Sequence, residues 1–424
     1  MNFLIKNARI VHHGQSAPTA PQDILIENGF IKKIGNSLIV NDLDFFDAAG
    51  ACLSTGFVDV GTQVCEPGLE HRETLETASR AAIAGGFTNI ATLPNSDPVA
   101  DKKSAIFYLK NKNFALPITV LPIGALSMEA KGGDMAELFD MHAAGAVAFS
   151  DGAKSVQDAG FLLRALQYVQ AFDGLILNVP HHKTIAAGGQ MHEGLMSTKL
   201  GLRGFPALAE EMMVLRDIQL VEYCGGKLHF SNISTAKSVE MVRLAKKSGQ
   251  KITASVAALN LGFTDEELVD FDSNWKVFPP VRLESDAAAL RKGVLDGTID
   301  FISSNHNPWD EESKNLEFPY AQFGAIGLET AFAVAQTFLH KTLTINGLVD
   351  KLTVGPRRVL GLEIPQIREG AVADFTIFDP EKRWVFSEKD IFSKSKNTPL
   401  VGRELMGKIV GVFSKGKFHP ATTA

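Results

Sequence analysis

Cysteine is scarce in this chain of 424 residues, and the three that occur, Cys52, Cys65 and Cys224, show no paired spacing. This usage argues against a disulfide framework and a cysteine-rich zinc site, and it fits a reducing cytosol. Uninterrupted apolar runs of about 18 residues are also missing, so we expect no membrane span. The apolar start of the chain is too short for a signal peptide. We therefore expect a cytoplasmic protein.

Positive charge is not in excess either. The formal net charge is −6 with a pI near 6.0, and no long cluster of Lys and Arg occurs, so we expect no nucleic-acid partner. The 45% of hydrophobic and 21% of charged residues are typical of an ordinary globular protein. The length suffices for one large barrel and a smaller domain.

Both ends of the chain are rich in short strand-like segments. Near the N-terminus the pair Asn28-Gly29 separates two apolar segments, which is a strong signal of a β-hairpin. Near the C-terminus, segments 373–378 and 409–413 are likewise short, mostly apolar and strand-like. We predict one small β-sandwich domain built from both chain ends, residues 1–54 and 366–424.

The middle of the chain, residues 55–365, alternates strand-like with helical segments. Apolar residues recur at helical spacing in 73–84, 158–171, 207–224 and 238–247. The strand-like segments are 57–60, 88–93, 118–123, 146–149, 174–179, 227–230, 251–254 and 301–302. This alternation predicts an α/β fold, a (β/α)8 TIM-type barrel. In such a barrel the side chains that follow the carboxyl ends of the strands form the site.

Several motifs, in order along nearly the whole chain, resemble those of the dihydroorotase family of the cyclic amidohydrolase superfamily. They are Glu-Pro-Gly at 66–68, Leu-Pro-Asn-Ser at 93–96, Gly-Gly-Gln-Met-His-Glu-Gly at 188–194, Lys-Val-Phe-Pro-Pro-Val-Arg at 276–282 and Phe-Gly-Ala-Ile-Gly-Leu-Glu-Thr at 323–330. Each motif alone is weak evidence, but their common order makes the resemblance strong.

The resemblance implies a binuclear zinc site with two histidines of the first barrel strand, a bridging acidic group, two further histidines and a catalytic aspartate. Zinc would activate a water molecule and polarise the amide carbonyl of the substrate. Matched residue by residue, the two first-strand positions are Gly61 and Gln63. The two further histidine positions are Val179 and Asn232, and the aspartate position is Asn305. We expect neither zinc nor another cofactor.

The positions that would bind the substrate are altered as well. The family arginine that follows the paired histidines is Cys65 here, and the asparagine before the Pro-Pro pair is Phe278. Asn95 and His306 match the family, and so does Asp151 at the position of the bridging acidic group. We predict that these three residues are remnants of a substrate pocket.

Other interpretations of single residues remain open. The adjacent His181 and His182, one strand end from Asp151, could contact a metal ion, although such a pair is more often a solvated loop. Asp151 could instead accept hydrogen bonds from loop amides or from Lys154. We expect His229, three residues before Asn232, to be structural.

The replaced positions share one property, because all of them now carry neutral side chains. A set of neutral residues avoids the free-energy cost of buried charges without a metal ion. Our interpretation is a dihydroorotase-like protein of pyrimidine biosynthesis that has lost zinc binding and hydrolase activity. The resemblance then implies a structural or regulatory role as partner of aspartate transcarbamoylase, and we expect a homodimer.

Two alternatives remain. The chain could be an active zinc-dependent dihydroorotase or a related cyclic amidase of the hydantoinase or allantoinase type. It could also be a non-catalytic sensor that binds a small molecule at the barrel mouth through Asn95 and His306.

Overall fold

The computed structural model describes residues 2–39 and 43–422, so residues 1, 40–42 and 423–424 of the predicted small domain lie outside the described range. Eight parallel strands follow one another around a barrel in chain order. They are β6 (Phe57–Thr62), β7 (Phe87–Thr92), β8 (Thr119–Gly124), β9 (Ala148–Phe149), β10 (Leu175–Asn178), β13 (Lys227–Phe230), β14 (Ile252–Ala257) and β15 (Phe301–Ser303). Each predicted strand segment overlaps one of them, and the predicted barrel is confirmed.

The last and first strands of the barrel are joined by hydrogen bonds of a buried carboxylate. Asp59 on β6 accepts hydrogen bonds from the backbone N–H and the hydroxyl of Ser304, both at 2.7 Å. The backbone N–H of Gln63 donates to the carbonyl oxygen of His306 at 2.9 Å. These bonds hold the carboxyl ends of β15 and β6 side by side, and that end of the barrel carries the predicted site.

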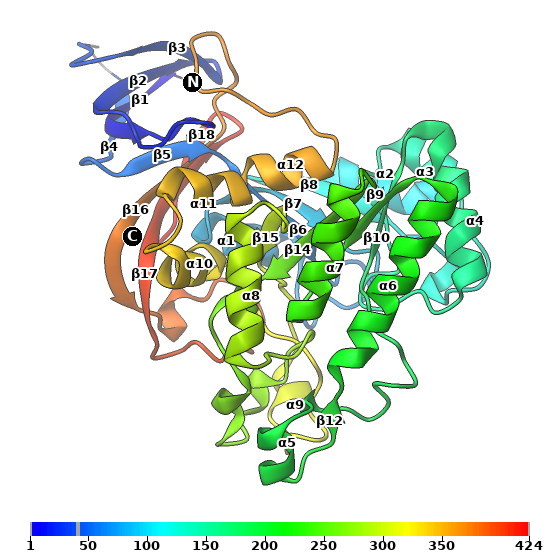
Figure 1. Cartoon of the computed structure of the whole chain (residues 1–424). Helices are drawn as coiled ribbons and strands as arrows, with labels where there is room; N and C mark the ends of the chain where they lie inside the picture. The colour runs from blue at the N-terminus through cyan, green and yellow to red at the C-terminus, as the bar shows by residue number, and fades with distance from the viewer. Residues whose placement is uncertain (1, 40–42, 423–424) are drawn as a thin grey trace.

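Helices surround the barrel (Figure 1). They are α1 (Leu75–Ala84), α2 (Lys103–Lys112), α3 (Leu138–Ala144), α4 (Ala159–Val169), α6 (Ala207–Cys224), α7 (Ala236–Lys247), α8 (Glu284–Leu295), α10 (Ala331–Leu339), α11 (Ile345–Leu352) and α12 (Val354–Val359). The predicted helices are present. The first begins later than expected because Thr74 caps it, accepting a hydrogen bond from the backbone N–H of Thr77.

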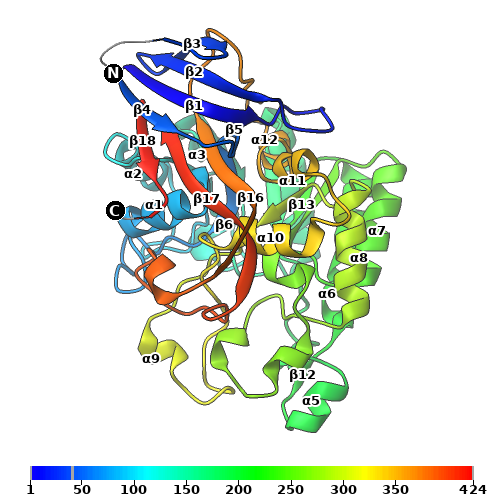
Figure 2. The ribbon, with the colours of Figure 1, turned by 90° about the vertical axis from the view of Figure 1, so that its left-hand side faces the viewer.

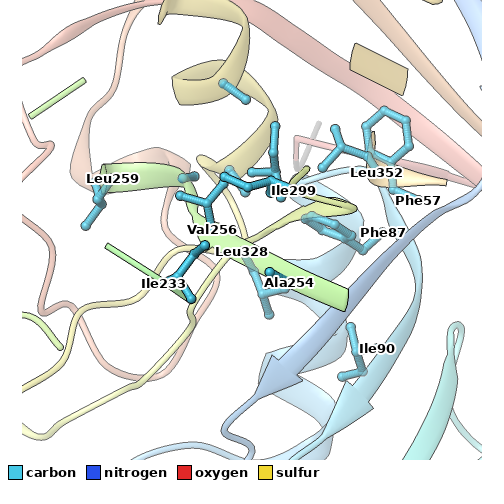
Figure 3. Packing of buried hydrophobic residues seen from close by; sticks show 14 of the residues in the cluster. Phe57, Phe87, Ile90, Ile233, Ala254, Val256, Leu259, Ile299, Leu328 and Leu352 are labelled. Atoms are coloured by element: carbon cyan, nitrogen blue, oxygen red, sulfur yellow. The ribbon is translucent and has the colours of Figure 1, made fainter. Parts of the chain in front are cut away.

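The main hydrophobic core lies between the barrel strands and these helices. Figure 3 shows Phe57, Phe87, Leu328 and Leu352 in this packing. The rings of Phe57 and Phe87 lie 6.0 Å apart, edge to face. Within residues 2–39 and 43–422, none of the helices combines the length and the apolar character that crossing a membrane requires.

The two ends of the chain form one eight-stranded sheet beside the barrel. Its strands are β1 (Asn2–Ile10), β2 (Pro21–Glu27), β3 (Phe30–Gly35), β4 (Asp44–Asp47), β5 (Cys52–Thr55), β16 (Phe375–Val385), β17 (Glu404–Ser414) and β18 (Lys417–Pro420). Figure 2 shows β16 to β18 beside β1 to β5. The rings of Phe46 on β4 and Phe418 on β18 stack with 4.4 Å between their centroids. This contact packs a strand from the N-terminal part of the chain against one from the C-terminal part. The predicted β-sandwich is confirmed.

The predicted hairpin is also present. Asn28 and Gly29 connect β2 and β3 with φ angles of 53° and 81°. A two-residue turn of this type needs positive φ at both positions, which asparagine and glycine adopt at low cost.

The segment between β10 and α6, here called the 179–206 loop, was not predicted as a separate feature. It contains β11 (Met191–His192), α5 (Leu195–Leu200) and β12 (Gly204–Phe205). Its end with α5 lies far from the small sheet (Figures 1 and 2). Arg282 anchors the loop to the barrel, donating to the Ser234 hydroxyl at 2.7 Å and lying 3.2 Å from His192 Nδ1 and 3.5 Å from Glu210. Burial, with Arg282 nearby, lowers the pKa of His192 to about 4, so the imidazole is neutral.

Candidate functional site

A cavity of about 730 Å³ opens at the carboxyl ends of the barrel strands. Eight of the residues singled out from the sequence line it, namely Gly61, Gln63, Val179, His181, Asn232, Phe278, Asn305 and His306. The 179–206 loop forms another part of the wall, with residues from His181 to Phe205. The structure thus brings together residues from strand ends far apart in the sequence, as the barrel prediction requires.

The end of the first strand places Gly61, which has no side chain, and Gln63, a neutral amide, at the cavity. Gly61 has a φ of 92°, and a Cβ there would meet nothing within 4 Å. The Gln63 side chain is nearly buried and donates from Nε2 to the carbonyl oxygen of Asn95 at 2.6 Å. The glutamine therefore ties the end of β6 to the segment after β7.

Two asparagines bridge the ends of β13 and β15. Asn232 donates from Nδ2 to Asn305 Oδ1 at 3.0 Å, and Asn305 donates from Nδ2 to the carbonyl oxygen of Phe278 at 2.9 Å. Asn232 Oδ1 accepts from the hydroxyls of Ser303 at 2.7 Å and Ser255 at 3.2 Å. Both asparagines have left-handed backbones, with φ angles of 57° and 52°. Asparagine is among the residues that tolerate this conformation.

Asp151 lies behind the wall of this cavity. Its Oδ1 accepts hydrogen bonds from the backbone N–H groups of Leu126 at 3.1 Å and Ser127 at 2.8 Å, and its Oδ2 accepts one from the Ser127 hydroxyl at 2.6 Å. Burial raises the pKa of Asp151, and these hydrogen bonds oppose the rise. Of the two non-metal roles considered for Asp151, the geometry matches the one in which it accepts hydrogen bonds from loop amides.

Asn95 and Cys65 also lie outside the cavity lining. Asn95 donates from Nδ2 to the Asp151 carbonyl oxygen at 3.1 Å, and its Oδ1 accepts from the backbone N–H of Ala153 at 3.2 Å. Cys65 is 2% exposed, and burial raises the pKa of its thiol to about 11. The family position of an arginine is thus a buried, neutral thiol.

The close approach of Asn95 depends on Gly152. A Cβ at this glycine would lie 1.6 Å from Asn95 Oδ1, and its φ is 67°. We predict that Gly152→Ala lowers the free energy of unfolding by about 2 kcal/mol more than Gly201→Ala, since it displaces the partly exposed Asn95 amide and breaks its two hydrogen bonds, each worth about 1 kcal/mol. Gly201 has the same φ with nothing within 4 Å, so it isolates the backbone effect. Urea unfolding of both variants measures the difference, and equal losses would contradict the assigned contact.

His306 lines the cavity, and its two ring nitrogens are turned towards Gly327 and Glu73. Its Nδ1 accepts a hydrogen bond from the backbone N–H of Gly327 at 3.2 Å. Its Nε2 lies 3.5 Å from the buried carboxylate of Glu73, whose pKa is lowered by His306 and hydroxyl groups against the opposing effect of burial. Neither Gly327 nor Glu73 belongs to the cavity lining.

The two adjacent histidines face different partners. His181 packs edge to face against Phe278, with 4.9 Å between ring centroids, and burial lowers its pKa to about 4. His182 Nδ1 lies 3.1 Å from the hydroxyl of Thr184. His229, expected to be structural, is fully buried between Thr253 and Ser255 and stacks on Phe301 at 4.8 Å.

The residues present do not fit the zinc centre that the resemblance implies. Gly61 and Val179 offer no ligand atom, and the amides of Asn232 and Asn305 are bonded to one another. Over residues 2–39 and 43–422, no group of three or more His, Cys, Asp or Glu side chains is placed to hold a metal ion. Zinc sites in proteins are built from just these residue types.

An aromatic wall faces the strand ends. Phe278 lies 5.6 Å from Phe205 and 6.3 Å from Phe323, measured between ring centroids, and 4.9 Å from His181. Phe205 comes from the 179–206 loop and Phe323 from the segment after β15. The sequence singled out Phe278 but not Phe205 or Phe323 as site residues, because neither directly follows a strand of the barrel.

Comparisons with known proteins agree with the motif pattern. A family model described as "Dihydro-orotase-like" matches residues 50–238, and one described as "Amidohydrolase family" matches residues 177–418. A protein named dihydroorotase from Pelotomaculum thermopropionicum is 41% identical over 96% of this chain and 96% of its own length. Another from Syntrophus aciditrophicus is 39% identical over 98% of this chain and 99% of its own length.

The fold is similar to that of a solved L-hydantoinase (dihydropyrimidinase) from Arthrobacter aurescens. The TM-score is 0.87, with 24% sequence identity and coverage of 100% of this chain and 97% of that chain. At this identity the likeness shows the fold alone.

Proposed function

Because the chain belongs to the dihydroorotase family, we propose that it acts in pyrimidine biosynthesis without zinc-dependent hydrolysis. In this proposal it is a cytoplasmic homodimer that serves as a structural or regulatory partner of aspartate transcarbamoylase. The main support for the loss of hydrolysis is the hydrogen bond from Asn232 Nδ2 to Asn305 Oδ1, at 3.0 Å. Both residues occupy positions at which the family has residues of the zinc site, and here they bind each other.

The chemistry of amide-ring hydrolysis supports this proposal. The reaction needs an activated water molecule and a base that takes up its proton. Asn305 stands where the family has the base, but an amide does not accept a proton at neutral pH, and both of its polar atoms are bonded within the protein. The carboxylate of Asp151 is likewise occupied by loop amides and a hydroxyl.

A second candidate function is favoured by the relatives. Proteins that are 37% to 41% identical over nearly their whole length are named dihydroorotase, which supports an active enzyme. In that case a catalytic centre would have to form from Asp151, His181, His182 and His306. In this structure these four side chains contact separate partners.

Turnover of dihydroorotate by the purified full chain separates the two candidates. We predict no ring opening above the rate without protein, and no ring closure of carbamoyl aspartate, with or without added zinc. The relative from Pelotomaculum thermopropionicum serves as the positive control. Turnover that is lost on chelation would overturn the proposal in favour of the enzyme.

Co-purification tests the partner. The full chain, tagged and expressed in its own organism, is expected to retain aspartate transcarbamoylase and to change its activity or sedimentation. If the transcarbamoylase neither binds nor changes in activity, the scaffold role is wrong.

A further inference from the structure

We propose that two surfaces of opposite charge, on one side of the molecule, join two copies of this chain, with each surface of one copy meeting the other surface of its partner. One surface is basic and aromatic and lies on α2. The other is acidic and apolar and lies around the short helix α9 (Glu311–Lys314). The inference rests on the homodimer of the proposed function and adds the residues that hold the two copies together.

The first surface, here called the α2 stripe, consists of Lys103, Phe107, Lys110 and Phe114. Residues three or four positions apart share one face of a helix, and this spacing separates each member from the next. Phe114 lies in the turn that continues the helix, where its backbone N–H donates to the carbonyl oxygen of Asn111 at 3.3 Å. Both lysines are exposed, and so are Phe107 by 51% and Phe114 by 94%. The helix thus presents two cations and two rings to solvent.

The second surface, here called the α9 face, consists of Glu311, Glu312, Leu316, Glu317 and Tyr320. All five residues are exposed, Leu316 by 47% and Tyr320 by 69%. Lys314 lies in the same segment but is buried, and its Nζ donates to the carbonyl oxygens of Gln322 at 2.9 Å and Gly324 at 3.0 Å. The α9 face therefore presents carboxylates and apolar side chains without a cation from its own segment.

A short loop, residues 66–71, connects the two surfaces. Glu66 at its start lies 3.1 Å from Lys112 Nζ of α2. His71 at its end lies 3.7 Å from Asp310, the residue that caps α9. Figure 2 shows α2 and α9 on the same side of the molecule. A twofold axis brings residue i of one copy to residue j of the other and j to i, so two surfaces on one side of the chain can meet reciprocally.

Charge decides which surfaces meet. Two α2 stripes placed together would bring lysines against lysines, and two α9 faces would bring carboxylates against carboxylates, which is unfavourable across an interface. A stripe against a face pairs lysines with carboxylates and covers the phenylalanine rings with apolar side chains, which removes apolar surface from water. Among the residues that the structure describes, no carboxylate lies within 4.0 Å of Lys103 or Lys110, so both ammonium groups are open to a partner.

Sedimentation velocity of the full chain over a range of concentrations tests the contact by charge reversal. We expect the wild type to form a dimer that weakens as the salt concentration rises. Lys103→Glu with Lys110→Glu, and separately Glu312→Lys with Glu317→Lys, are each expected to weaken the dimer by more than about tenfold, since each sets like charges against one another. An equimolar mixture of the two double variants is expected to restore it, because the reversed stripe then meets the reversed face.

Two further variants complete the test. Lys33→Glu with Lys382→Glu is the matched control, since it makes the same change of charge at exposed lysines of β3 and β16 and is expected to leave the dimer unchanged. Phe114→Ser probes the apolar part of the contact. We expect it to weaken the dimer without lowering the free energy of unfolding, because Phe114 is almost fully exposed within one copy.

The outcomes separate this inference from the proposed function. A dimer that persists in both double variants uses another surface, and this result overturns the inference alone. So does a mixture that fails to restore the dimer, or a wild type that grows into assemblies larger than a dimer, since the contact is then not reciprocal. A monomeric wild type overturns the inference together with the homodimer. The loss of hydrolysis and the transcarbamoylase partnership are decided by their own experiments.

Discussion

Replacing Asn305 by alanine is expected to lower the free energy of unfolding by about 3 kcal/mol. The substitution removes the bond accepted from Asn232 and the bond donated to Phe278, so it leaves a partly buried donor and a partly buried acceptor without their protein partners. It also places alanine at a φ of 52°, which asparagine adopts more readily. Urea unfolding at neutral pH measures the loss.

Asn28→Ala is the matched control for this loss. Asn28 has a φ of 53° and is exposed in the β2–β3 turn, so its replacement has the backbone cost without the loss of the two partly buried hydrogen bonds of Asn305. We expect a loss of about 1 kcal/mol there. If both variants lose the same stability, the Asn232–Asn305 bond does not hold the strand ends together.

Acid is expected to destabilise the protein through His229 at pH values well above the ordinary range of acid unfolding. Complete burial lowers the pKa of His229 from 6.5 to about 3, so the folded protein keeps this imidazole neutral. The unfolded chain takes up a proton near pH 6.5. The unfolded state therefore binds more protons below pH 6.5, and stability falls with falling pH towards the folded pKa.

A variant without the titrating group measures this contribution. Between pH 6.5 and 5 the wild type should lose about 2 kcal/mol more than His229→Gln, because one pKa unit corresponds to about 1.4 kcal/mol. The comparison uses the change with pH and not the absolute stability, so carboxyl groups common to both proteins cancel. Parallel pH profiles would show that His229 is not a buried neutral imidazole.

The barrel was predictable because its signals are local. Apolar strand segments alternate with helices of regular spacing, and residues at the strand ends must converge in such a fold. Gly61, Asn232 and Asn305, which the family resemblance singled out, accordingly line one cavity. The hairpin at Asn28 followed equally from local backbone preference.

The packing around the site was not predictable, since it depends on contacts between distant segments. Asn95 matches the family, but Gly152 allows it to approach the segment after β9, where it bonds to the backbone of Asp151 and Ala153. The 179–206 loop has two-residue strands, too short to show any alternation. Phe205, in this loop, therefore had no signal in the sequence, and the motif that begins at Phe323 did not show that its ring lies beside Phe278.

The measurement that tests the central claim most directly is the metal content of the purified chain. The protein is expressed in zinc-supplemented medium and analysed by plasma mass spectrometry, with the metal expressed per chain. A site closed by the Asn232–Asn305 bond predicts zinc, manganese and iron far below one equivalent. One or two tightly held equivalents would contradict the account and make Asp151, His181, His182 and His306 the first residues to test as ligands.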